Sequence, residues 1–449
     1  MRQRFWFEQA WLPDGWAKSV LVTVTDGQIA AVEANAEPGG AERHVAAIPG
    51  LCNVHSHGFQ RGMAGLSETR GQPEDDFWSW REVMYRFLDR LTPEDVVAIT
   101  AQAYVEMLET GYTRVGEFHY LHNGVSGERY ADPAEMAGAI AAAAETAGIG
   151  LTLLPVFYAH SDFGGAAPVP GQRRFVSDVD GFARLVEASR SKLGDDANLG
   201  IAPHSLRAVT PAELDAILPL AGGGPIHIHA AEQQREVEAC LAWSGARPVE
   251  WLLDHAPLDP RWCLIHATHL TDAECDRLAA SGVVAGLCPV TEANLGDGIF
   301  PATRYLARGG RIATGTDSNI YVDAAGELRA LEYSQRLRDR RRVLTADEAA
   351  PSAGTRLFRD VLAGGAQALG VRGGLVVGAA ADIVSFAMSH PCFAAADPAT
   401  ILDRWIFTGR TGPIDRVWRA GRLCVEGGRH VAAEAVAVRY AAAMRRVLA

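Results

Sequence analysis

Lysine is the scarcest charged residue in this sequence. Of the 42 basic residues, only Lys18 and Lys192 are lysines, and the other 40 are arginines. A biased genomic base composition, which would also favour alanine and glycine, is enough to explain such a count. The scarcity nevertheless limits the side chains from which a metal site in this protein can be built.

Several other features are missing as well. The formal net charge is -12, so the chain lacks the excess of positive charge typical of proteins that bind nucleic acid or acidic membranes. There is no uninterrupted apolar run of ~18 residues that could span a membrane, and the first residues lack a secretory signal. The seven cysteines are scattered and form no CxxC pair. We therefore expect a cytoplasmic protein with reduced cysteines that binds neither nucleic acid nor membranes.

The composition that remains is that of a large folded protein. The chain has 449 residues, of which 48% are hydrophobic and 21% charged, which suffices to bury a sizeable core. Residues 4–47 and 375–430 both contain short β-prone runs, and Thr25-Asp26-Gly27 is typical of a hairpin turn. We predict that the two ends of the chain pair into one small composite β-sandwich domain.

Between the two ends, apolar strand candidates alternate with helical patterns. They fall near residues 46–55, 112–118, 149–157, 198–203, 225–229, 262–266, 282–287 and 310–315. Eight buried strands separated by helices predict an α/β fold, a (β/α)8 TIM-type barrel. A doubly wound open sheet competes, but no GxGxxG follows the first strand. The predicted barrel domain covers residues 48–374, and the sandwich domain takes residues 1–47 and 375–449.

The clearest helical pattern covers residues 93–109. Thr92 is a typical N-cap, Pro93 occupies the first helical position, and Gly111 follows the end. Further helices are predicted near residues 133–147, 179–192, 211–219, 232–243, 271–280 and 326–338, with an Ala-rich helix at about 432–448.

Side chains that bind metals follow the first and fifth predicted strands. The first strand ends with His55 and His57, which share a face because they lie two residues apart. The fifth ends with His229, and Glu232 follows three residues later. Alone, each pattern is also compatible with ordinary polar residues in a loop. His227 shares the face of His229 one layer deeper, and we interpret it as a histidine of the core.

The sixth and eighth strands continue this arrangement. The sixth ends with His266, and Asp317 follows the eighth, where an aspartate is also a common helix N-cap. Four strands that all present such side chains at one end of a barrel are hard to attribute to chance. Three imidazoles and a carboxylate suit Zn²⁺ or Fe²⁺ with a position left for water. Glu232 can then shuttle a proton, and His266 can orient the nucleophile or stabilise charge.

With these motifs, the chain resembles the amidohydrolase superfamily over nearly its whole length. The similarity includes PGLCNVHSH at residues 49–57, the pair formed by His229 and Glu232, His266, and GTD at residues 315–317. Binuclear members carry a bridging lysine on the fourth strand, which here reads LGIAPH at residues 199–204. The resemblance therefore implies one divalent metal, Zn²⁺ first and Fe²⁺ as the alternative. Its expected ligands are His55, His57, His229 and Asp317, with Asp317, Glu232 and His266 as the catalytic residues.

Within that superfamily, the sequence is most similar to the deiminases of N-formimino-L-glutamate, which act in histidine degradation. The similarity rests on HGFQRGMAG at residues 57–65, FWSWR at 77–81, GEFHYLH at 116–122 and APHSLR at 202–207. It implies hydrolysis to N-formyl-L-glutamate and ammonia, with a small dicarboxylate as the partner. The implied substrate contacts are Gln60, Arg81, Tyr120, His204 and Arg207.

The two arginines also make physical sense. Arginine suits bidentate recognition of carboxylates, and Arg207 follows the fourth strand at the predicted barrel mouth. Arg81 lies in a long segment that could fold over the site as a lid, although a surface arginine on an amphipathic helix is an equally good interpretation. The neighbouring aromatic residues Phe77, Trp78 and Trp80 are interpreted as packing.

Several alternatives stay open. A deaminase of guanine, cytosine or S-adenosylhomocysteine would share the metal site and differ in the pocket, and an enzyme acting on a ring amide or a chlorotriazine is a second rival. A barrel that only binds a structural metal has less support, because such a site would be closed. We expect a homodimer, for which the C-terminal helix is a candidate interface. The sequence assigns no role to His119, His122, His160 and His269.

Overall fold

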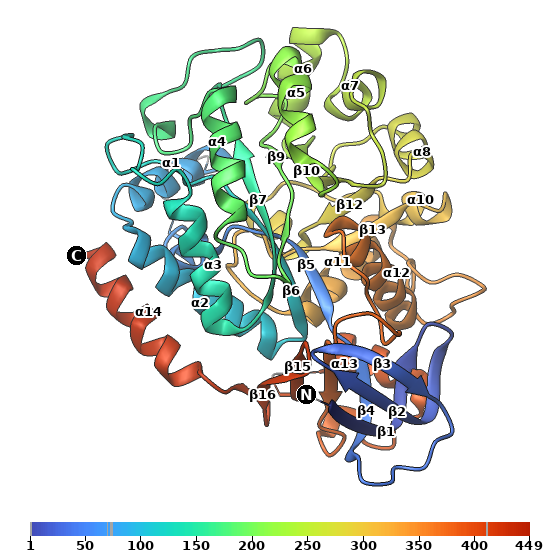
Figure 1. The fold of residues 1–449 in the computed structure, drawn as a ribbon. Coiled ribbons are helices and arrows are strands. Elements are labelled where there is room, and N and C mark those ends of the chain that lie inside the picture. Colours follow the sequence, from blue (N-terminus) through green and yellow to red (C-terminus); the bar gives the residue numbers. More distant parts are fainter. Residues whose placement is uncertain (1, 70, 72–74, 410–411) are drawn as a thin grey trace.

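The computed structural model describes residues 2–69, 71, 75–409 and 412–449. Its centre consists of two parallel sheets with helices around them (Figure 1). One sheet contains β5 (Leu51–Ser56), β6 (Tyr112–His119), β7 (Gly150–Phe157) and a split fourth strand, β8 (Asn198–Leu199) with β9 (Ala202–Pro203). The other sheet contains β10 (Ile226–Ala230), β11 (Trp262–His266), β12 (Val284–Leu287) and β13 (Arg311–Thr314).

Backbone bridges join the two sheets on both sides. Ser56 pairs with Asp317 next to β13, and Ile201 pairs with Ile226 at the start of β10, both in parallel. The strands therefore follow one another around a ring in chain order, with helices between them. This arrangement confirms the predicted (β/α)8 barrel.

The first barrel strand is shorter than predicted. The run over 46–55 is divided at Gly50 into β4 (Glu42–Pro49), which belongs to the terminal sheet, and β5. A side chain at residue 50 would come within 2.2 Å of Thr113, so only glycine fits there. The pairing of β5 with β6 is irregular between Asn53 and Ser56. Such irregularities re-aim side chains, and this one occurs where the strand carries its first histidine.

Helices surround the ring. They are α1 (Phe77–Leu88), α2 (Pro93–Glu109), α3 (Glu135–Ala147), α4 (Val179–Arg190), α5 (Pro211–Ile217), α6 (Gln234–Ser244), α7 (Pro248–His255), α8 (Asp272–Ala280), α9 (Pro289–Leu295), α10 (Ala302–Ala307), α11 (Ala324–Asp339), α12 (Ala353–Ala368), α13 (Ile401–Thr408) and α14 (Ala433–Leu448). Short 3-10 turns are η1 (Gly58–Met63), η2 (Pro170–Gln172), η3 (Leu218–Ala221), η4 (Pro391–Phe393) and η5 (Pro398–Thr400). Within the described residues, no helix combines the length and apolar character that crossing a bilayer requires.

Helix α2 begins and ends as its sequence predicts. The Thr92 side chain accepts from the backbone N–H of Asp95, and Asp95 accepts from the backbone N–H of Thr92 at 3.0 Å. This reciprocal capping box satisfies two N–H groups that the first turn would otherwise leave without partners. At the other terminus of the chain, α14 packs against α2 along the outside of the barrel (Figure 1).

Both ends of the chain build one sheet. Its strand order is β17 (Arg429–His430), β16 (Arg422–Glu426), β15 (Ile414–Arg419), β14 (Ile383–Phe386), β4, β1 (Arg2–Leu12), β2 (Gly15–Thr25) and β3 (Gln28–Glu33). The ring of Phe5 in β1 lies 5.1 Å from that of Trp418 in β15, three places away. The sheet therefore curls until its halves face each other, as in a sandwich. The domain limits at residues 47–48 and 374–375 stay a prediction.

The amino end of the barrel is closed by the end of α12. Ala368 and Leu369 pack with Val54, Ile265 and other strand residues in a small apolar cluster. The carbonyl of Ala368 accepts a 2.8 Å hydrogen bond from His227 Nε2. The carboxyl ends of the strands stay available for polar side chains, which is where barrels of this type carry their sites.

Candidate metal centre and active site

The four side chains predicted to hold a metal meet at the carboxyl end of the barrel. Asp317 Oδ1 lies 3.3 Å from His55 Nε2 and 3.2 Å from His57 Nε2. His55 Nε2 in turn lies 3.2 Å from His229 Nε2. All four residues are at most 6% exposed. These side chains come from three strand ends that are far apart in the sequence, and the closed ring brings them together.

The imidazole rings are oriented so that a ring nitrogen is available to bind a cation. His57 Nδ1 donates to the carbonyl of Phe118 at 2.8 Å, and His229 Nδ1 donates to the carbonyl of His204 at 2.9 Å. Burial lowers the pKa of His55 to about 3 and holds the pKa of His229 well below its ordinary value. The Nε2 lone pairs of His57 and His229 therefore point at Asp317 and at His55 Nε2, respectively. Acceptor atoms this close repel one another, and a divalent cation bound between them would remove the repulsion.

A thiol lies beside the same cluster. Cys288 forms, with His266 and Asp317, a further group whose ligand atoms lie within 4.8 Å of one another. Burial raises the pKa of Cys288 well above its ordinary value. Because the thiolate is the form that binds metals, this cysteine is a poor ligand at neutral pH, and the histidine and aspartate set is the better candidate.

A network of side chains fixes the two strand ends that carry three of these ligands. Asn53 Nδ2 donates to Thr316 Oγ1 at 2.7 Å, and Thr316 Oγ1 donates to Asn319 Oδ1 at 2.6 Å. Asn319 Nδ2 donates to the carbonyls of His57 and Asp317, both at 3.1 Å. The end of β5 is thereby tied to the segment after β13, so the backbone sets the ligand positions.

The backbone is strained at several of these strand ends. The φ angle is +50° at Ala231, +68° at His266 and +46° at Asp317. Residues other than glycine seldom adopt this left-handed region, which costs on the order of 1–3 kcal/mol each. Hydrogen bonds hold the conformation, among them the one from His57 N to the carbonyl of Asp317 at 2.9 Å. Such strain is typical of functional sites.

Glu232 and His266 face each other beside the ligand cluster. Glu232 Oε1 lies 3.7 Å from His266 Nε2, and Asp317 Oδ2 lies 3.9 Å from the same nitrogen. Burial raises the pKa of Glu232 to about 7. A carboxyl group with that pKa both accepts and releases a proton near neutral pH, as a proton shuttle must. The buried Glu236 steadies this turn by accepting from the backbone N–H of Glu232 at 3.1 Å.

Glu292, on α9, orients His266 from behind. Its Oε1 accepts from His266 Nδ1 at 3.2 Å and from the backbone N–H of Cys288 at 2.8 Å. Burial lowers the pKa of His266, but neighbouring carboxylates outweigh it, Glu232 most of all, and raise the pKa to about 10. Our sequence reasoning missed Glu292. It follows the seventh predicted strand, so the signal that identified the other site residues would have found it.

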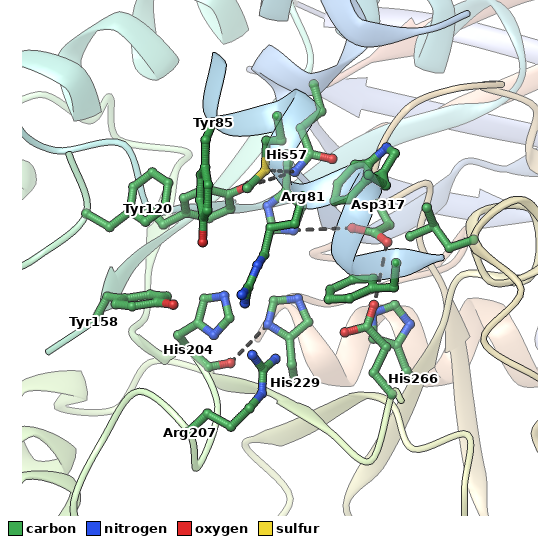
Figure 2. Close-up of a pocket in the computed structure, with 17 residues that line it drawn as sticks. His57, Arg81, Tyr85, Tyr120, Tyr158, His204, Arg207, His229, His266 and Asp317 are labelled. Carbon is green, nitrogen blue, oxygen red and sulfur yellow. Dashed lines mark hydrogen bonds and ion pairs between the residues drawn. The ribbon is translucent and has the colours of Figure 1, made fainter. Parts of the chain in front are cut away.

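A hollow of about 570 Å³, which includes its open mouth, lies over this cluster (Figure 2). All five predicted substrate contacts line it: Gln60, Arg81, Tyr120, His204 and Arg207. Helix α1 supplies five of the lining residues, Phe77, Trp80, Arg81, Met84 and Tyr85. Helix α1 therefore lies over the site as a lid, and Arg81 is on the side of α1 that faces the cavity.

Two guanidinium groups enter this cavity without an acidic partner. Arg207 is 6% exposed, and the buried Nε atoms of Arg207 and Arg81 have no hydrogen-bond partner. Within the part of the chain that the structure describes, neither arginine forms an ion pair. Figure 2 shows their ends pointing into the same space. Burial disfavours the charge of Arg207, but nearby charges, Glu236 first, outweigh burial and raise the pKa of Arg207. No carboxylate among the described residues contacts either guanidinium directly, so their N–H groups are available to an anion in the cavity.

Uncharged hydrogen-bonding groups surround the arginines. Gln60 Nε2 donates to the hydroxyl of Tyr120 at 2.6 Å, while Gln60 Oε1 is buried without a partner. His204 lies with its ring 4.6 Å from that of Tyr158, and burial holds the pKa of His204 well below its ordinary value. A neutral imidazole, an amide and a phenol can thus contact a ligand that the arginines hold.

Five histidines of the barrel to which the sequence assigns no catalytic or ligand role do not line the cavity; they are His119, His122, His160, His227 and His269. His122 Nε2 donates to the carbonyl of Val156 at 2.9 Å, and His160 Nε2 lies 2.9 Å from Glu213. His227 lies deeper than the site, as its interpretation as a core histidine requires. These positions give none of the five a direct contact with a ligand in the cavity.

Comparison with known proteins identifies the family. The Amidohydrolase family matches residues 46–424, and the N-terminal domain of formimidoylglutamate deiminase HutF matches residues 5–46. A formimidoylglutamate deiminase from Pseudomonas aeruginosa is 49% identical over 95% of both chains. A 5-methylthioadenosine/S-adenosylhomocysteine deaminase from Natronomonas pharaonis is 30% identical over 77% of this chain and 73% of its own.

A solved structure agrees with both matches. The crystal structure of an amidohydrolase from Brucella melitensis superimposes with a TM-score of 0.96, at 51% identity and over 100% of each chain. The terminal sheet and the barrel are thus parts of one known architecture. The chain belongs to the amidohydrolase family.

Proposed function

We propose that this protein hydrolyses N-formimino-L-glutamate to N-formyl-L-glutamate and ammonia, a deimination that belongs to histidine degradation. The observation that carries the proposal is the pair of guanidinium groups of Arg81 and Arg207, which enter the cavity without an acidic partner. A dicarboxylate supplies the missing anions, and the Pseudomonas aeruginosa relative is named for this reaction. A purine or pyrimidine ring would supply no anion to the buried Arg207 or the half-buried Arg81.

One divalent metal ion would be held by His55, His57, His229 and Asp317. We propose Zn²⁺, because neutral imidazole nitrogens and one carboxylate are ligands that zinc commonly takes, with Fe²⁺ as the alternative. When bound, such an ion acts as a Lewis acid and makes water a stronger nucleophile at neutral pH.

The chain's own residues then bind the substrate and move protons. Arg81 and Arg207 hold a carboxylate, and Gln60, Tyr120 and His204 hydrogen-bond the rest of the glutamate part. Water adds to the formimino carbon, oriented by His266 and Asp317. Glu232 takes up one proton from the water and delivers it to the imino nitrogen, which becomes an amino group on a tetrahedral carbon that also carries the hydroxyl. Glu232 then passes the hydroxyl proton to this amino group, so that the C–N bond breaks, the C=O bond forms and ammonia leaves. The carbon keeps the water oxygen and becomes the formyl group.

Three further properties are proposals of the same kind. The domain limits are 1–47 and 375–449 for the composite sheet domain with the C-terminal helix and 48–374 for the barrel, although β4 continues in the sheet to Pro49. A homodimer is supported by the exposed apolar side chains of α14, such as Val438 at 64% and Leu448 at 51% exposed. A cytoplasmic location is supported by the cysteines, all seven of which are free.

Ammonia release tests the proposed reaction. Purified protein loaded with Zn²⁺ is offered N-formimino-L-glutamate, guanine, cytosine and S-adenosylhomocysteine in parallel. We expect release from N-formimino-L-glutamate alone, and no release from that substrate after the His229→Ala substitution. Release from one of the ring compounds and none from N-formimino-L-glutamate would contradict the proposal.

A further inference from the structure

The indole of Trp78 contacts three guanidinium groups from three separate segments of the chain. Trp78 lies in the first turn of α1, and the Cζ of Arg81 in the same helix is 4.5 Å from the centre of its ring. The Cζ of Arg235, in the first turn of α6, is also 4.5 Å away. The Cζ of Arg207, after β9, is 5.7 Å away. One aromatic side chain thus connects the lid helix to two parts of the barrel mouth.

The contact with Trp78 offsets the electrostatic repulsion among the three arginines. Within the described residues, none of these three arginines is paired with a carboxylate. Three like charges near one cavity repel one another, and an acidic partner would neutralise the groups that must bind an anion. An aromatic face attracts a guanidinium through its electron-rich ring. A guanidinium over the ring can keep its N–H groups for a carboxylate, and the Nε atoms of Arg81 and Arg207 have no hydrogen-bond partner.

The backbone holds the indole in place. The Asp76 side chain caps α1 and accepts from the backbone N–H of Trp78 at 2.9 Å and of Ser79 at 3.1 Å. Arg235 is exposed and its α6 begins two residues after Glu232. Its stacking on Trp78 therefore joins the start of α1 to the segment that carries the proposed proton shuttle.

We propose that Trp78 is a positioning residue for the substrate carboxylate. Its indole keeps the guanidinium groups of Arg81 and Arg207 together with their N–H edges free, and its stacking against Arg235 fastens α1 over the cavity. This inference rests on the proposed function, because it assumes that the two arginines bind the substrate. It assigns Trp78 and Arg235 a role in substrate affinity, although neither lines the cavity.

The test measures affinity separately from chemistry. Trp78→Leu removes the aromatic face and is expected to raise KM on the order of tenfold, while kcat changes less than threefold. Trp78→Phe keeps an aromatic face and should restore most of the affinity. Arg235→Met, on the exposed side of the contact, should raise KM about threefold, and Arg235→Lys should raise it less. The matched control is Arg86→Met, an exposed arginine of the same helix, which should leave KM unchanged.

A second measurement does not depend on turnover. Binding of glutarate, a five-carbon dicarboxylate, is followed by calorimetry on zinc-loaded protein, and it should weaken in Trp78→Leu and Arg235→Met as KM rises. The inference is overturned if both variants keep KM and the glutarate Kd within twofold of the parent protein, or if only kcat falls. A parent protein that releases no ammonia from N-formimino-L-glutamate contradicts the proposed function instead. If it still binds glutarate, the calorimetry tests Trp78 on its own.

Discussion

Replacing Arg207 by methionine separates a binding arginine from a structural one. The side chain is buried at the cavity wall, its Nε has no partner, and its guanidinium forms no ion pair among the described residues. Methionine keeps much of the length and the apolar stem while removing the charge. In the proposed complex the substrate carboxylate loses one charged hydrogen-bonding partner, and the metal ligands lose nothing.

The size of the effect follows from the contact that is lost. A hydrogen bond to a charged group contributes about 1.5–3 kcal/mol, which corresponds to roughly a 10- to 150-fold rise in KM. Because Arg81 still holds the carboxylate, we expect the lower half of this range. Initial rates of ammonia release over a range of N-formimino-L-glutamate concentrations give KM and kcat, and elemental analysis gives the metal content, which should not change.

The stability of this variant is a second readout. Burial disfavours the charge of Arg207, but nearby charges, Glu236 first, outweigh it and raise the pKa of the guanidinium, so the two effects oppose each other and Arg207→Met should change the free energy of unfolding little. A structural arginine would lower the free energy of unfolding when removed, because its hydrogen-bond partners would be left unsatisfied. An unchanged KM together with a lower Tm would refute the assignment of Arg207 to the substrate.

Three other substitutions test separate parts of the account. Glu232→Gln should lower kcat about 10²- to 10⁴-fold with metal content retained, and near-normal turnover would contradict the proton shuttle. Glu292→Gln should lower kcat about 10- to 100-fold with little change in KM, because His266 loses the carboxylate that orients it; an unaffected kcat would remove that role. Thr92→Ala should lower the free energy of unfolding by about 1 kcal/mol in urea titrations without changing KM, and no loss of stability would show that the cap of α2 contributes nothing.

Capping and turn residues predict those helices and turns whose structure depends on contacts between neighbouring residues. Helix α2 follows its capping residues, and the turn at Asp26 and Gly27 adopts the positive φ angles, +48° and +81°, that its hairpin needs. The division of the run over 46–55 at Gly50 was not predictable in this way. It depends on the close approach of Thr113 from β6, a contact between strands that sequence periodicity does not encode. The short helices α9 and α10, of seven and six residues, give too few turns for a helical period to show.

In the candidate site, too, only part of the arrangement could be predicted from the sequence. The positions of His55, His229 and Asp317 follow from one rule, that side chains at the carboxyl ends of barrel strands meet. The residues that hold these side chains in place come from loops, and the sequence does not show how those loops fold back onto the strand ends. Asn319 contacts the carbonyls of both β5 and the β13 segment, and nothing in the sequence pairs it with them. Trp78 was interpreted as packing because the pattern of α1 shows an aromatic residue but not the arginines that come to it from α6 and the loop after β9.

The central claim is deimination of a formimino dicarboxylate, and its most direct test is product analysis. Zinc-loaded protein is incubated with N-formimino-L-glutamate in ¹⁸O-labelled water, and ammonia and the organic product are measured together. The account predicts equal amounts of ammonia and N-formyl-L-glutamate, with one labelled oxygen in the formyl group and none in the carboxylates. Failure to form N-formyl-L-glutamate, or ammonia release without the labelled formyl oxygen, would contradict it.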